Sequence, residues 1–129
     1  MRKYVAVDGG MTDNPRPALY DSKYEAMLAN RGNDSNEETV SIAGKCCESG
    51  DMLIWDLELP RVNQGDLLAV SCTGAYNYAM ASNYNRIRRP AVVFVKDGVS
   101  DVVVKRETLE DIISCDVIPE RISKQPSYK

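Results

Sequence analysis

Short stretches in which apolar and polar residues alternate recur along the chain, and this spacing is typical of half-buried β-strands. Alternation, or a short apolar run between turn residues, predicts strands at 4–7, 23–31, 39–44, 52–60, 67–72, 91–95 and 99–105. Asp97-Gly98 joins the last two runs, and this dipeptide strongly favours a tight hairpin. The pattern therefore predicts a mainly β fold with about seven or eight short strands.

Two segments refine this prediction. Residues 67–72 are almost continuously apolar, which indicates a buried strand. Residues 108–114 carry acidic side chains near their start, where a helix dipole favours them, and predict one short helix late in the chain. Short strands, frequent turns and little helix are typical of a sandwich or partly open barrel. We therefore expect residues 1–129 to form a single β domain.

Composition narrows the class of protein. The 129 residues are 43% hydrophobic and 27% charged, which favours one globular core over a disordered chain. The net charge is −3 and the basic residues are scattered, which argues against a nucleic-acid partner. The chain has neither an apolar run long enough to span a bilayer nor a secretory signal pattern, so we expect a cytoplasmic protein without membrane contact.

The chain has four cysteines, at positions 46, 47, 72 and 115, and no histidine. Catalysis by Ser-His-Asp or Cys-His and zinc binding by Cys-His sets are therefore excluded for this chain alone. A four-cysteine metal site needs two spaced pairs, and only one adjacent pair is present, so we predict no metal. We expect Cys46, Cys72 and Cys115 to be structural.

Cys47 and Glu48 place a thiol beside a carboxylate in a loop that follows the strand predicted at 39–44 and is closed by Gly50-Asp51. Loops on a rigid β scaffold present reactive side chains to solvent. Judged by residue type alone, Cys47 is more often an inert small apolar residue than a reactive one. Its position in the loop makes it a candidate for chemistry.

Arg16 lies between Pro15 and Pro17, which hold the backbone on both sides of it. A guanidinium that loses little freedom on binding is a good clamp for a carboxylate. Tyr20 follows four residues later, and one helical turn would bring the two side chains to the same side. The alternative is a surface arginine in a turn. Tyr76 belongs to a tyrosine-rich segment, and tyrosine is typical of ligand and interface contacts.

Taken together, these motifs resemble the C-terminal domain of the diaminopimelate decarboxylase family, over nearly the whole chain. The matching residues are Val7-Asp8-Gly9-Gly10-Met11, Asn14-Pro15-Arg16-Pro17-Ala18-Leu19-Tyr20, Cys47-Glu48-Ser49-Gly50-Asp51, Gly74-Ala75-Tyr76, Met80 and Ser82-Asn83-Tyr84-Asn85. The family consists of pyridoxal-phosphate enzymes of alanine racemase-like architecture, with an N-terminal (β/α)8 barrel and a C-terminal β domain. The chain is similar to the second domain only, so we expect residues 1–129 to lack the barrel.

The resemblance also implies roles for individual residues. Arg16 and Tyr20 match the pair that holds a substrate carboxylate, and Tyr76 matches the tyrosine against the substrate, the cofactor and its phosphate. Cys47 and Glu48 match a loop that reaches across a homodimer into the partner's active site. There the thiol is a candidate acid for reprotonating the reacting carbon, and the carboxylate faces the distal ammonium of the substrate.

The activity implied is decarboxylation of meso-2,6-diaminopimelate to L-lysine and CO2, the last step of lysine biosynthesis, with pyridoxal 5'-phosphate as cofactor. The Schiff-base lysine would come from the barrel, so we expect the isolated chain to be inactive. In such enzymes a strand from the N-terminal end also completes the β domain, which predicts an unpaired sheet edge here.

Two other functions remain open from the sequence. The chain could be a non-catalytic β module that binds a small acid through Arg16 and its tyrosines. It could also be a thiol redox sensor that uses Cys46 and Cys47, for which Lys45 is the nearby positive charge.

Overall fold

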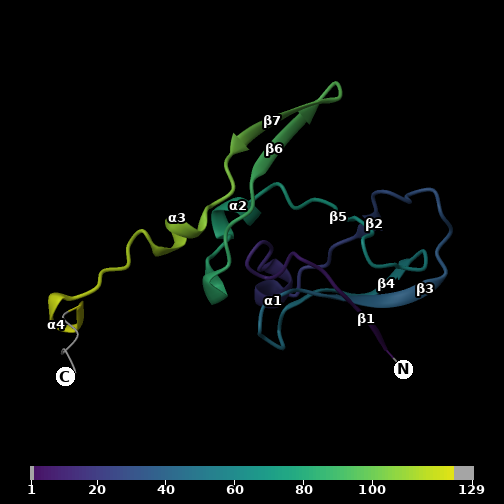
Figure 1. The fold of residues 1–129 in the computed structure, drawn as a ribbon. Helices are drawn as coiled ribbons and strands as arrows, with labels where there is room; N and C mark the ends of the chain where they lie inside the picture. The colour runs from purple at the N-terminus through teal and green to yellow at the C-terminus, as the bar shows by residue number, and fades with distance from the viewer. Residues whose placement is uncertain (1, 124–129) are drawn as a thin grey trace.

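The computed structural model describes residues 2–123 and shows a mainly β fold (Figure 1), as the sequence predicts. The strands of this part of the chain are β1 Lys3–Ala6, β2 Ala26–Leu28, β3 Glu38–Ala43, β4 Met52–Leu59, β5 Leu68–Val70, β6 Val92–Lys96 and β7 Val99–Val104. Its helices are α1 Arg16–Tyr20, α2 Asn77–Met80, the 3-10 turn η1 Tyr84–Arg86, α3 Leu109–Ile113 and α4 Glu120–Ser123. The strands form three separate sheets and no closed barrel within residues 2–123.

The largest sheet has the order β1-β3-β4 and sets the geometry of the rest. β1 runs parallel to β3, with Val5 opposite Ile42, whereas β3 and β4 are antiparallel. Hydrogen bonding between the two parallel segments continues beyond the strands, because the Val7 N–H donates to the Ala43 carbonyl over 3.0 Å. Parallel strands end at the same edge of a sheet. The loops that follow β1 and β3 therefore emerge side by side.

The hydrophobic core lies between this sheet and β2. It consists of Leu28, Val40, Ile42, Leu53, Ile54 and Leu59. The alternation predicted at 39–44 places Val40 and Ile42 inward, and Ile42 is fully buried. Ser41 is also buried, next to a register shift between β3 and β4, and its hydroxyl accepts the N–H of Asp56. The buried hydroxyl of Ser41 thus has a hydrogen-bond partner.

β6 and β7 form the hairpin predicted from Asp97-Gly98. Both turn residues have positive φ, 51° for Asp97 and 76° for Gly98, as a two-residue hairpin turn requires. Glu107 secures the base of the hairpin, because its carboxylate accepts the backbone N–H of Arg89 and the side-chain amide of Asn83. These contacts hold the pKa of Glu107 below its ordinary value, with the Arg89 N–H as the largest cause.

Two details of the sequence prediction are wrong. The apolar run 67–72 contains only a three-residue strand, β5, which pairs with β2 alone, and Leu67 is 64% exposed. A strand in a two-stranded sheet has too few neighbours to be buried. The late helix is present as α3, capped by Thr108, but further helices of three to five residues precede and follow it. Helices this short are below the length at which a helical period is detectable.

Candidate functional site

Arg16 opens α1, directly after Pro15 at the N-cap position. The single turn of this helix brings Arg16 and Tyr20 to the same side, with 5.7 Å between the guanidinium carbon and the centre of the tyrosine ring. The prediction that one helical turn brings the two side chains to the same side is therefore confirmed. Arg16 forms no ion pair within residues 2–123, so the donors of its guanidinium are available to a ligand.

Tyr76 approaches the same guanidinium from another part of the chain. Its ring centre lies 5.5 Å from the guanidinium carbon of Arg16, and the side chain is 71% exposed. The backbone of Tyr76 has φ 70°, a conformation that is costly for a bulky residue and that gathers at functional sites. Arg16 is thus flanked by Tyr20 and Tyr76, and we call these three residues the arginine cluster.

The loop of residues 44–51, here called the cysteine loop, presents Cys47 and Glu48 to solvent and buries Cys46. Burial, followed by the neighbouring carboxylate of Asp51, raises the pKa of the Cys46 thiol and keeps it protonated. The Glu48 carboxylate accepts the N–H of Gly50 over 2.9 Å, which closes the loop locally. Of the adjacent thiols, Cys47 is therefore the accessible one.

Cys72 and Cys115, which we expected to be structural, are exposed, so neither contributes to the core. Cys46 is the buried one of the three. Within the described residues there is no group of three or more Cys, Asp or Glu side chains that could hold a metal ion.

Asp51 is a site residue that the sequence presented only as a turn former. It is 3% exposed, and its two carboxylate oxygens accept backbone N–H groups from two different loops, that of Met11 over 2.6 Å and that of Cys46 over 2.7 Å. Its own carbonyl accepts the N–H of Gly44 over 2.8 Å. The carboxylate thus connects the cysteine loop to residues 8–15, the segment that leads to Arg16.

The cysteine loop lies beside the segment that leads to Arg16, because the Lys45 N–H donates to the Gly9 carbonyl over 3.1 Å. No hydrogen bond or ion pair joins Cys47 or Glu48 to the arginine cluster in the described part of the chain. From the sequence we expected Arg16, Tyr20 and Tyr76 to contact substrate or cofactor. We expected Cys47 and Glu48 to reach into the active site of a partner subunit. The structure brings the arginine cluster together and leaves the cysteine loop separate from it.

Asn77, next to Tyr76, was also missed from the sequence. It is 5% exposed, and neither its amide nitrogen nor its oxygen has a hydrogen-bond partner within residues 2–123. It lines a cavity of about 380 Å³ together with Gly10, Asn14 and Tyr78. Buried amides are ordinarily paired, so this wall of the cavity can accept a polar group.

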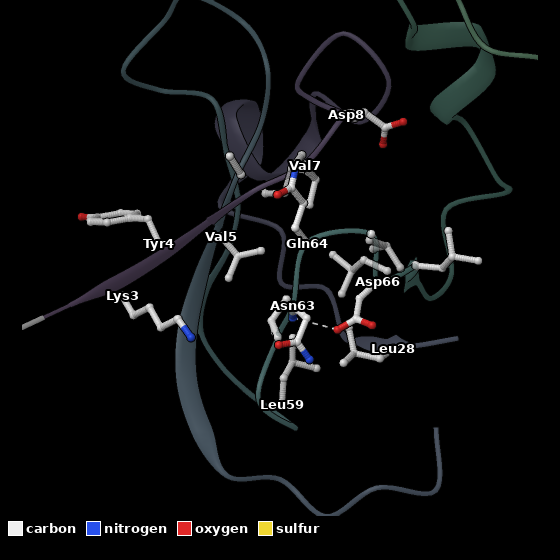
Figure 2. Close-up of a pocket in the computed structure, with 18 residues that line it drawn as sticks. Lys3, Tyr4, Val5, Val7, Asp8, Leu28, Leu59, Asn63, Gln64 and Asp66 are labelled. Atoms are coloured by element: carbon white, nitrogen blue, oxygen red, sulfur yellow. Dashed lines mark hydrogen bonds between the residues drawn. The ribbon is translucent and has the colours of Figure 1, made fainter. Parts of the chain in front are cut away.

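A larger groove, of about 720 Å³, lies beside β1, and none of the five predicted site residues lines it (Figure 2). Tyr4 and Val5 of β1, and Val7 just after it, line the groove together with Asn63, Gln64 and Asp66, all labelled in Figure 2. β1 pairs only with β3 among the described strands, so its other edge, facing this groove, has no strand partner there. An unpaired edge is what the family resemblance leads us to expect.

The comparison with protein families assigns the chain to a known family. Residues 1–74 match the family described as pyridoxal-dependent decarboxylase, C-terminal sheet domain, and the chain belongs to that family. No helix among residues 2–123 has the length and apolar character needed to cross a membrane.

The individual proteins that the chain matches indicate one kind of decarboxylase within this family. The diaminopimelate decarboxylase of Bacillus subtilis is 69% identical over 117 residues, which are 91% of the chain and 27% of that enzyme. The enzyme of the same name from Synechocystis is 52% identical over 122 residues, 95% of the chain and 26% of that enzyme. The crystal structure of diaminopimelate decarboxylase from M. jannaschii in complex with L-lysine superposes with a TM-score of 0.85 and 38% identity, over 92% of the chain and 27% of that protein.

The chain therefore spans about a quarter of the length of these relatives. The resemblance indicated by the sequence motifs is confirmed, and so is the mainly β fold.

Proposed function

We propose that the chain is the C-terminal domain of a diaminopimelate decarboxylase, which converts meso-2,6-diaminopimelate to L-lysine and CO2 in the last step of lysine biosynthesis. The observation that carries the proposal is the 69% identity to the B. subtilis enzyme of that name over 91% of the chain. The M. jannaschii relative was crystallised with L-lysine, which is the product of the proposed reaction.

In this reaction the arginine cluster binds a carboxylate of the substrate. Arg16 is held by flanking prolines and two aromatic rings, so its fork of N–H donors loses little freedom when an anion binds. The hydroxyl groups of Tyr20 and Tyr76, both on exposed side chains, can donate to the same anion or to a neighbouring phosphate.

The cysteine loop supplies the other two groups. Loss of CO2 leaves an electron pair on the α-carbon, which must then take up a proton, and the exposed thiol of Cys47 is the candidate donor. Glu48 offers a negative charge for the ammonium at the end of the substrate that is not decarboxylated. We propose that this loop acts across the interface of a homodimer, so that each active site is shared.

The residues present fit one side of pyridoxal 5'-phosphate. Tyr76 offers an exposed hydroxyl and ring beside the Arg16 guanidinium, and Asn77 adds an unpaired buried amide at the same turn. An anionic aromatic cofactor needs such donors and such a ring face. When bound, pyridoxal phosphate supplies the sink for the electron pair left by CO2. We propose that the Schiff-base lysine comes from the N-terminal (β/α)8 barrel, which is the partner domain that this chain requires. We propose that the complete enzyme acts in the cytoplasm.

The test is reconstitution. The chain is mixed with a separately expressed N-terminal barrel domain, pyridoxal phosphate and meso-diaminopimelate, and lysine and CO2 are assayed. We expect activity only in the mixture, and we expect Arg16→Ala or Glu48→Ala to abolish it, whereas the exposed Glu58→Ala leaves it unchanged.

An inactive mixture in which both domains are folded and bound to each other would contradict the proposal. The remaining role would then be a binding module for small acids. That role predicts affinity of the chain alone for a dicarboxylate, and loss of this affinity with Arg16→Ala.

A further inference from the structure

The buried carboxylate of Asp51 connects the two loops of the candidate site, and we propose that Asp51 is the residue that positions both. The inference rests on the function proposed above and deepens it. Asp51 itself does not contact substrate or cofactor, because its side chain is 3% exposed and both its carboxylate oxygens accept backbone N–H groups.

One oxygen of Asp51 controls the approach to Arg16. Oδ1 accepts the N–H of Met11 over 2.6 Å, at the start of a turn in which the Gly10 carbonyl accepts the N–H groups of Asp13 and Asn14. The side chain of Asn14, itself buried, then accepts the N–H of Arg16 over 3.4 Å. A continuous series of hydrogen bonds therefore runs from Asp51 to the first residue of α1.

The other oxygen controls the cysteine loop. Oδ2 accepts the N–H of Cys46 over 2.7 Å, one residue before Cys47. The backbone N–H of Asp51 donates to the Glu48 carbonyl over 3.1 Å, and its carbonyl accepts from Gly44. The segment that carries Cys47 and Glu48 is thus attached to Asp51 at both of its ends.

Two glycines make room for this carboxylate. A Cβ on Gly44 would collide with the Asp51 carboxyl group, and a Cβ on Gly10 would lie 2.8 Å from Oδ2. Neither glycine is in the left-handed region. Glycine is therefore needed at both positions because a side chain would not fit, and not because of the backbone conformation. Each loop therefore contributes a glycine as well as an N–H group to the same carboxylate.

A buried carboxylate is costly unless hydrogen bonds compensate it. Asp51 has no ion-pair partner in the described part of the chain, and the two loop N–H groups compensate its burial. An amide in its place has a single acceptor oxygen, so one loop would lose its acceptor and face an NH2 group. This chemistry explains why a carboxylate, and not an amide of equal size, suits the position.

The first experiment uses the complete enzyme that carries this domain. We expect Asp51→Asn to lower kcat/KM for meso-diaminopimelate by about 100-fold, the effect of a small displacement of groups that contact substrate. Asp34→Asn, the matched control in an exposed loop, should stay within about twofold, because surface ion pairs contribute little. Wild-type activity together with an unchanged kcat/KM in Asp51→Asn would overturn the proposal.

A double-mutant cycle separates positioning from general destabilisation. If Asp51 acts through the cysteine loop, Cys47→Ala should lower kcat/KM by a much smaller factor in the Asp51→Asn background than in the wild type, because the thiol is already misplaced. Equal fold-losses in the two backgrounds would show that Asp51 does not act through this loop. Gly44→Ala keeps every polar group and should reproduce the loss, whereas Gly32→Ala, where a Cβ meets only ordinary contacts, should not.

A readout independent of activity covers the case in which the wild type does not decarboxylate, an outcome that rejects the proposed function alone. Amide hydrogen exchange of the same protein reports the two N–H groups directly. In Asp51→Asn or Gly44→Ala we expect exchange at Met11 and Cys46 to accelerate at least about tenfold while Val40 in β3 keeps its protection. Unchanged exchange at Met11 and Cys46 would overturn the positioning role.

Discussion

Arg16 and Tyr76 lie against each other although they are far apart in the sequence, with 5.5 Å between the guanidinium carbon and the ring centre. Tyr20 flanks the same guanidinium at 5.7 Å. A guanidinium between aromatic rings keeps its edge free, and its N–H donors lie along that edge. The arginine cluster is therefore suited to a planar anion that approaches in the plane of the guanidinium.

Replacement of Arg16 should act mainly on substrate binding. In the complete enzyme we expect Arg16→Lys to raise KM about tenfold, because lysine keeps the charge but loses the planar fork of donors. Arg16→Ala should raise KM further. Steady-state kinetics with meso-diaminopimelate measures both, and Arg61→Lys, an exposed residue outside the cluster, is the control. A normal KM in Arg16→Lys would contradict recognition through the planar fork.

Glu48→Gln tests the counter-charge for the distal ammonium. The substitution keeps size and removes charge, so we expect KM to rise about tenfold with a smaller change in kcat. Glu58→Gln, on the exposed side of β4, should leave both constants unchanged. An unchanged KM in Glu48→Gln would remove its assigned role.

Cys47→Ala tests proton delivery. Loss of a general acid should lower kcat by about 100-fold, while KM and pyridoxal phosphate binding, followed by cofactor absorbance, change little. Cys72→Ala is the control, since that thiol is exposed and outside the cysteine loop. Near-normal turnover in Cys47→Ala would mean that another group donates the proton.

Asp66 should make stability depend on pH. The N–H of Asn63, followed by the side chains of Asn30 and Arg31, holds the pKa of Asp66 below its ordinary value of 3.8. A group with a lowered folded-state pKa stabilises the protein above its unfolded pKa, and this contribution is lost as the pH falls through the folded pKa. We therefore expect Asp66→Asn to lower the melting temperature at neutral pH and to flatten its decline in acid.

Melting temperatures measured from about pH 6 to pH 2 check this prediction. Asp101 lies on β7, and its exposed side chain has no hydrogen-bond partner among residues 2–123. Asp101→Asn should therefore follow the wild-type curve. Parallel acid profiles for wild type and Asp66→Asn would contradict it.

Local patterns predicted the elements that local interactions determine. Alternation located β3 and β4, and the Asp97-Gly98 pair located the hairpin, because positive φ at those positions needs such residues. Pairing between distant segments was not predictable, since the parallel register of β1 and β3 depends on tertiary packing.

The same distinction holds for the site. The spacing of Arg16 and Tyr20 within one helical turn was visible in the sequence, whereas the approach of Tyr76 depends on the fold. Asp51 follows a glycine, which is a turn signal, and its burial arises only because Gly10 and Gly44 lie close to it in space. A buried acid in a polar loop has no sequence pattern of its own.

The parallel pairing of β1 and β3 has a practical consequence for experiments on this protein. Both strands deliver their loops at one end of the sheet, and the exposed connection at residues 32–37 leads into β3 at the opposite end, at Glu38. A fluorophore, an affinity tag or a few inserted residues in this connection would leave the strand register unchanged. Segment 32–37 is therefore the place to attach a reporter without disturbing the candidate site.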